Sequence, residues 1–183
     1  DFFMKLKRFV FGLFFLLISL YAEAQKKIEG PLIHGYGETF AVPQPDLAVD
    51  TEADYKVVFD IANAPEDPAK LNPYFNTVAR FLNMHAHAGI EKSKLQPILV
   101  VHGSAAFGLL KNKFYKEQFG VDNPNLELLN TLHKLKIPVI LCGQTAGARE
   151  ISVEKRWGKT QLALSAMTAL IQYQNMDYAL ISF

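Results

Sequence analysis

The sequence has a single cysteine in 183 residues, so no disulfide can form within the chain. Positive charge is not in excess: 19 Lys and Arg face 18 Asp and Glu, which argues against nucleic acid as a partner. No Walker-type or GxGxxG pattern is present, and we expect no nucleotide or other cofactor. Half of the residues are hydrophobic, so the chain is expected to fold on an apolar core.

The first 24 residues have the layout of a secretory signal peptide, with residues 1–3 read as translated upstream sequence. Residues 4–8 are basic, residues 9–20 are almost purely apolar, and Ala22-Glu23-Ala24 is a small-x-small cleavage motif. The alternative is an uncleaved membrane anchor, but the apolar run is shorter than the roughly 20 residues of a spanning helix. We expect cleavage after Ala24, a periplasmic or secreted product, and no membrane contact after cleavage.

Residues 25–54 are rich in glycine and proline and lack a helical period. This segment is predicted to be an extended N-terminal arm that lies on its own domain or on a neighbouring chain. From residue 55 to residue 183 the pattern changes to one α/β domain.

Strand-like and helix-like patterns alternate through this domain. The predicted strands are residues 55–61, 95–102, 137–142, 161–164 and 178–183. The predicted helices are residues 73–88, 104–112, 126–135, a segment starting at 146–151, and 165–174, with a polar loop over 113–125. Three strands are apolar at consecutive positions, which is typical of strands covered on both faces. We therefore predict a three-layer α/β/α sandwich with a mostly parallel five-stranded sheet.

Ligands of such sheets bind beyond the carboxyl ends of the strands. The residues predicted at this edge are Asn63, His102, Gly103, Ser104, Cys142, Gly143, Gln144, Thr145 and Ser165. The segments 102–104 and 143–145 are also candidates for holding an anion with backbone N–H groups.

Cys142 is the candidate catalytic residue, because it ends a predicted strand just before a helix start. Gly143 permits a sharp turn, and Thr145 is the predicted N-cap. A thiol near a helix N-terminus has a lowered pKa, and Arg149 adds positive charge if its turn faces the sulfur. The alternative is a buried cysteine that acts as a small apolar side chain.

His102 ends a strand at the same predicted edge as Cys142. One interpretation makes His102 the base that takes the proton of the thiol, and the other makes it a hydrogen-bonded histidine with no chemical role. His85 and His87 are two residues apart on a predicted helix, so they point in different directions and cannot chelate one metal ion. We expect no metal site.

Three segments of the domain resemble the DsrE/DsrF-like family. Residues 137–146 (IPVILCGQTA) resemble its cysteine motif, and residues 165–170 (SAMTAL) and 178–183 (YALISF) resemble its closing helix and strand. The resemblance implies an α/β/α sandwich that assembles into small oligomers. It also implies that Cys142 accepts sulfur as a persulfide and passes it to a partner protein.

Three functions are compatible with these patterns. The first is an exported sulfur carrier or sulfurtransferase-like protein that uses Cys142, with a sulfur donor or acceptor protein as partner. The second is a non-enzymatic homo-oligomer that binds a small anion or a partner at the same edge. The third is a thiol redox sensor that pairs between chains.

Overall fold

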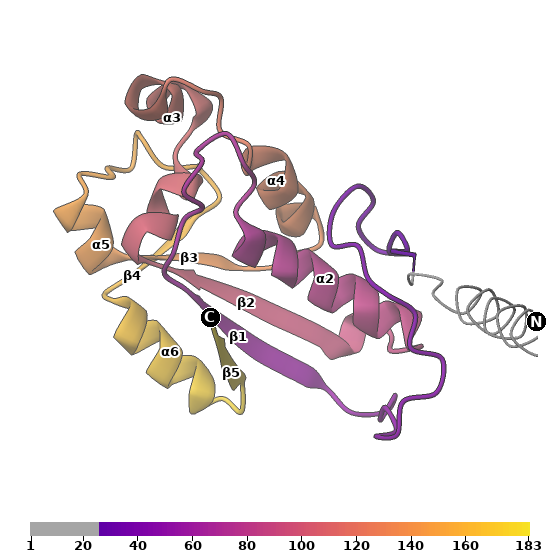
Figure 1. Ribbon diagram of the computed structural model, residues 1–183. Helices are drawn as coiled ribbons and strands as arrows, with labels where there is room; N and C mark the ends of the chain where they lie inside the picture. The colour runs from indigo at the N-terminus through magenta and orange to yellow at the C-terminus, as the bar shows by residue number, and fades with distance from the viewer. Residues whose placement is uncertain (1–25) are drawn as a thin grey trace, which may run out of the picture.

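A five-stranded sheet forms the centre of the computed structural model, which describes residues 26–183 (Figure 1). The strands are β1 (Tyr55–Ile61), β2 (Leu95–Val101), β3 (Val139–Cys142), β4 (Gln161–Ala163) and β5 (Ala179–Ser182). Their order across the sheet is β4-β3-β2-β1-β5, and every pair is parallel. The predicted sheet is confirmed, with strand ends that differ by one or two residues from the predicted ones.

Helices cover both faces of the sheet, as predicted. One face carries α2 (Pro73–His87) and α4 (Leu126–Lys134), which pack with β1 and β2 in the larger core. The other face carries α6 (Ala166–Gln174), whose Ala166 and Ala169 pack on β1, β2 and β3 in a smaller core. Figure 1 shows α2 and α4 on the opposite side of the sheet from α6.

The helix α2 begins and ends as its sequence indicates. Pro73 occupies its first turn, and the side chain of Asn72 accepts a hydrogen bond from the Tyr74 N–H at 2.9 Å. Gly89 follows the helix with φ +91°, a conformation that favours glycine.

Two predictions of secondary structure were wrong, one of a loop and one of a helix. The predicted polar loop over 113–125 contains α3 (Asn112–Phe119), which ends at Gly120 with φ +77°. Tyr115 is the one residue of α3 that is buried, so the apolar stripe is too narrow to show in the sequence. The predicted helix over 104–112 is a 3₁₀ helix over Gly103–Leu109.

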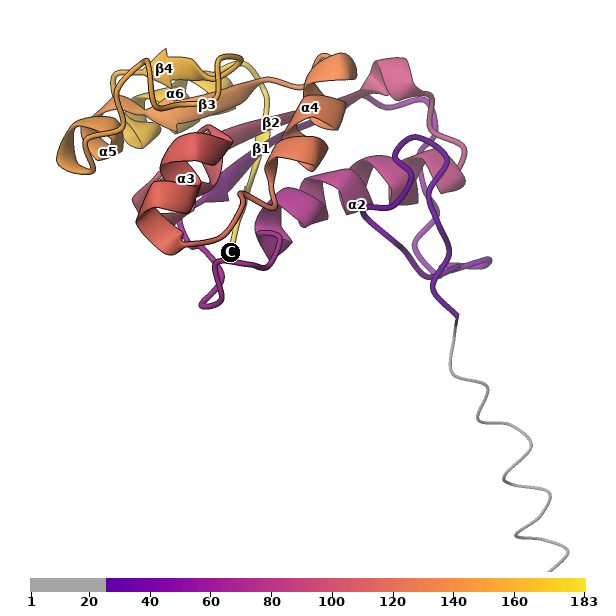
Figure 2. The same cartoon turned by 90° about the horizontal axis from the view of Figure 1, so that it is seen from above.

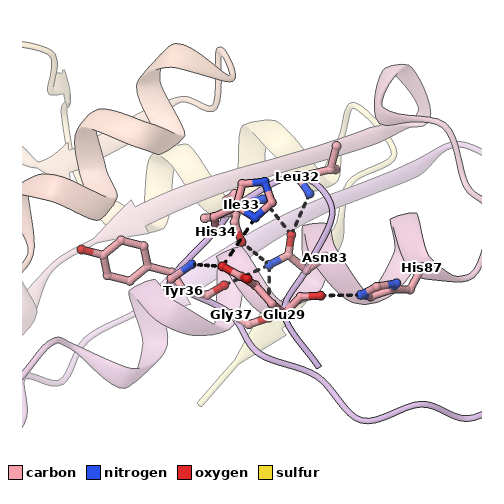
Figure 3. A network of polar contacts seen from close by, with 9 residues as sticks. Glu29, Leu32, Ile33, His34, Tyr36, Gly37, Asn83 and His87 are labelled. Atoms are coloured by element: carbon pink, nitrogen blue, oxygen red, sulfur yellow. Dashed lines mark hydrogen bonds and ion pairs between the residues drawn. The ribbon is translucent and has the colours of Figure 1, made fainter. Parts of the chain in front are cut away.

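The N-terminal arm lies on its own domain, where Asn83 of α2 holds it (Figure 3). The Asn83 side chain is fully buried, and its Oδ1 accepts hydrogen bonds from the N–H groups of Leu32 (3.2 Å) and Ile33 (2.9 Å). Its Nδ2 donates to the carbonyls of Ile33 and Tyr36, both at 2.9 Å. The Asn83 side chain thus satisfies backbone N–H and carbonyl groups in a part of the arm that pairs with no strand.

The predicted signal peptide lies outside the described residues. Within residues 26–183, none of the helices has the length and apolar character needed to cross a membrane.

Candidate functional site

Cys142 lies at the junction between β3 and α5 (Gly143–Ala148). It is itself the N-cap of α5: its Sγ accepts a hydrogen bond from the Thr145 N–H at 3.4 Å. The prediction that Thr145 caps a helix starting near residue 146 was therefore wrong. A cysteine is not a usual N-cap residue, and the short helix begins directly after the strand.

Several hydrogen-bond donors surround the sulfur of Cys142. Burial raises the pKa of the Cys142 thiol, since only 5% of this residue is exposed, but the donors lower the pKa more. The net pKa is therefore below the usual value. The donors are the Thr145 hydroxyl and the backbone N–H groups of Thr145, Ala166 and Gln144. Because these groups favour the anion, the site stabilises a thiolate.

These donors come from the starts of two helices. Gln144 and Thr145 belong to the first turn of α5, and Ala166 is the first residue of α6. Ser165 caps α6, and its Oγ accepts from the Thr168 N–H at 3.0 Å. Figure 2 shows α5 and α6 together at the β3–β4 end of the molecule.

Thr145 connects Cys142 to the segment that follows β2. The Thr145 Oγ1 accepts a hydrogen bond from the Gly103 N–H at 3.3 Å, which leaves its own proton for the sulfur. Gly103 has φ +56°, and a Cβ there would lie 2.4 Å from the Ala62 carbonyl oxygen. Glycine is therefore required at residue 103, and its backbone orients the Thr145 hydroxyl.

Gly143 lets β4 approach the Cys142 backbone closely. A Cβ at Gly143 would lie 2.6 Å from the carbonyl oxygen of Ala163 and 3.0 Å from that of Leu164. Gln144 reinforces this contact, because its Nε2 donates to the Leu164 carbonyl at 3.2 Å. The end of β4, and with it the start of α6, is held against the thiol.

The structure pairs His102 with Asp60 of β1. The His102 Nε2 lies 2.8 Å from Asp60 Oδ1, and the other Asp60 oxygen accepts from the Ser182 hydroxyl at 3.4 Å. Among the described residues, no hydrogen bond joins His102 to Cys142. The geometry therefore agrees with the interpretation in which His102 is a hydrogen-bonded histidine, and not with the one in which it takes the proton of the thiol.

Two other predicted residues belong to the β1 side of this edge. Ser104 Oγ accepts from the Ala64 N–H at 2.9 Å and lies 3.4 Å from the Ala62 carbonyl oxygen. The exposed Asn63 uses its backbone carbonyl to accept from the Asn72 side chain at 2.9 Å. Both residues shape the loop after β1. Gly103, Gly143, Gln144, Thr145 and Ser165 are the predicted residues that gather around Cys142.

Arg149 is engaged elsewhere: its guanidinium lies 4.9 Å from the centre of the Phe107 ring. It is not among the causes of the lowered pKa of Cys142.

Sequence reasoning missed Asp60 and Ala166. Asp60 is a charged residue in the apolar strand KVVFDI, and that irregularity is a signal that could have found it. Ala166 acts through its backbone, so no side-chain pattern identifies it.

A shallow hollow of about 570 Å³ lies beside α5, with Gly143, Ala146 and Leu162 in its lining. It brings solvent next to the site, while Cys142 itself is buried, with 5% of the residue exposed. Within the described part of the chain, no three His, Cys, Asp or Glu side chains gather in a way that could hold a metal ion.

A family model agrees with this architecture over most of the chain. The model of the DsrE/DsrF-like family matches residues 56–183, which include β1 from its second residue onward, the other four strands and Cys142. The chain belongs to the DsrE/DsrF-like family. It has the sulfur-relay-like fold of that family, and the arm before residue 56 is outside the match.

Two solved structures share the fold of this DsrE/DsrF-like protein. The ychN protein from E. coli has a TM-score of 0.51 at 19% identity, covering 70% of this chain and 98% of that one. MTH1491 from Methanobacterium thermoautotrophicum, a protein of unknown function, has a TM-score of 0.50 at 15% identity, covering 71% and 100%. At these identities the likeness concerns the fold alone. No curated protein matches the chain.

The close approach of β4 to residue 143 predicts the effect of a methyl group there. Gly143→Ala should lower the free energy of unfolding by about 1–3 kcal/mol, because the Cβ meets two carbonyl oxygens. Chemical denaturation followed by circular dichroism measures this change.

Gly147→Ala is the matched control, because a Cβ at that position of α5 meets nothing within 4 Å. It should be neutral or stabilise by about 0.4–1 kcal/mol. Equal effects of the two substitutions would contradict the account of Gly143.

Proposed function

We propose that Cys142 is a sulfur carrier that holds sulfane sulfur as a persulfide. The observation that carries the proposal is the set of donors from the α5 and α6 starts that lowers the pKa of the thiol. A thiolate is the form that attacks a sulfur–sulfur bond, so the site favours the reactive form. Family membership agrees with this role.

The transfer is a thiol exchange, in which one sulfur atom passes from the thiol of the donor to the thiol of Cys142. The Cys142 thiolate attacks the terminal sulfur of a donor persulfide, R–S–SH, and the sulfur–sulfur bond of the donor breaks. The donor leaves as the thiolate R–S⁻, and Cys142 becomes Cys–S–SH. An acceptor thiolate takes the sulfur by the same step and restores the Cys142 thiolate, so no oxidant is consumed.

We also place this exchange in the periplasm or outside the cell, as the signal-like residues 1–24 suggest. An exposed thiol in an oxidising compartment is liable to form disulfides between chains. The 5% exposure of Cys142 supports a thiol protected from that reaction. The same burial requires the donor to come close to the junction of β3 and α5, where Cys142 lies.

Persulfide formation tests the function directly. After incubation with a small-molecule persulfide donor, intact-protein mass spectrometry should show a gain of one sulfur atom that a reductant removes. Cys142→Ser should lose the adduct. His102→Gln should keep it, because His102 is bonded to Asp60.

Two other results would contradict the proposal and favour the alternatives. A thiol that reacts only after unfolding would indicate a buried cysteine in a non-enzymatic binding module. A covalent dimer that reductant separates, with no sulfur adduct, would indicate a redox sensor.

We further propose that the protein is a homo-oligomer in which a second copy covers the outer face of α6 and β4. Large apolar side chains are exposed there: Leu162, Leu164, Met167, Ile171 and Met176. Met167 and Ile171 are four residues apart on α6 and therefore lie on one helix face. Contiguous exposed apolar surface of this kind marks an interaction site.

Substitution of Ile171 by glutamate should weaken this assembly, because it would bury a charge at the interface. Light scattering at several protein concentrations should show a larger fraction of monomer for Ile171→Glu than for the wild type. Leu47→Glu is the control, since Leu47 is 86% exposed on the arm, and it should leave the assembly unchanged. A wild-type protein that is monomeric throughout would contradict the proposal.

A further inference from the structure

A groove of about 340 Å³ lies between α2 and the strands β1 and β5. It is on the α2 face of the sheet, whereas Cys142 belongs to the core on the α6 face. Large apolar side chains form its walls: Tyr55, Phe59, Phe81, Met84, Ile181 and Phe183. Its volume is in the range of sites that bind small molecules.

The groove exists because β5 extends the sheet beyond α2. β5 pairs with β1 at the edge of the sheet, and α6 packs on β5 from the opposite face. Ala179, Ile181 and Phe183 alternate along the strand and line the groove together. Ile181 is 38% exposed, so apolar surface is open to solvent at the bottom of a concave site.

Aromatic contacts hold the walls of the groove in place. The Phe59 ring packs edge-on against Phe81 at 5.7 Å and stacks on Phe183 at 6.0 Å between ring centres. Phe81 also contacts His85 at 4.3 Å, and His85 contacts Tyr55 at 4.9 Å. Because these rings support one another, the groove is formed before any ligand enters.

The charged side chains that line the groove have one sign. Among residues 26–183, Arg80 and Lys56 line it and no Asp or Glu does. The Lys56 ammonium is directed to the other face, 3.5 Å from the Met176 carbonyl oxygen and 5.8 Å from the Tyr178 ring centre. Arg80 is exposed and makes no ion pair with any residue in 26–183. The Arg80 guanidinium therefore lies beside the apolar groove.

We propose that this groove binds an apolar carboxylate, with its hydrocarbon part between α2 and β5 and its carboxylate on Arg80. A guanidinium recognises a carboxylate through two parallel hydrogen bonds, and the aromatic walls bury the hydrocarbon. The site is separate from Cys142 and does not depend on sulfur transfer.

Isothermal titration calorimetry with decanoate and decan-1-ol tests the proposal, because the two probes share the chain and differ in the charge. Decanoate should bind the wild-type protein more tightly than decan-1-ol does. Arg80→Gln should weaken decanoate binding by about tenfold and leave decan-1-ol binding unchanged. Arg149→Gln is the control, since Arg149 packs on Phe107, and it should change neither affinity.

A second variant locates the hydrocarbon part. Ala179→Trp places an indole in the groove from an exposed edge-strand position, and it should abolish binding of both probes. Nuclear magnetic resonance of the wild type gives the same information without a variant: decanoate should shift the methyl signals of Met84, Ala179 and Ile181.

Four results would overturn the proposal. The first is a wild-type protein that does not bind decanoate, and the second is that decanoate shifts methyl signals outside the groove instead. Equal binding of the two probes, unaffected by Arg80→Gln, would show a neutral apolar site instead. A dimer that Ala179→Trp separates, together with no decanoate binding, would show that a second copy fills the groove.

Discussion

The site depends on one arrangement, the convergence of backbone N–H groups from two helices on the sulfur of Cys142. The strand order produces it: β3 lies between β2 and β4, so the segments that follow these three strands meet at one edge. Gly143 lets the end of β4 come close, and Gly103 positions the hydroxyl of Thr145. Backbone groups that are fixed by the fold need no reorganisation when the sulfur becomes an anion.

The two faces of the sheet are covered to different extents, and each has its own candidate site. The α2 face has a large core, and its groove opens where β5 extends past the helix. The α6 face has a small core and exposes Met167 and Ile171 on its helix. Cys142 is part of this thinner side, so a partner that docks there also lies close to the thiol.

Much of the fold could be predicted from the sequence, because apolar runs such as residues 98–101 reflect strands that are buried on both faces. The helix α3 was missed because its polar surface conceals a single buried residue, Tyr115. The sequence pattern identified Cys142 as a thiol at the end of a strand. It did not identify all of the hydrogen-bond donors to this thiol, because Ala166 contributes a backbone group from a segment 24 positions further along the sequence.

The most direct test of the account is the pKa of the Cys142 thiol, followed by thiolate absorbance as the pH is raised. We expect the pKa of the wild-type thiol to lie below the usual value for a cysteine side chain, because the donors outweigh burial. Thr145→Val should raise it by removing the hydroxyl donor, and Thr145→Ser should keep it low. A wild-type pKa at or above that of free cysteine, unchanged in Thr145→Val, would contradict the account.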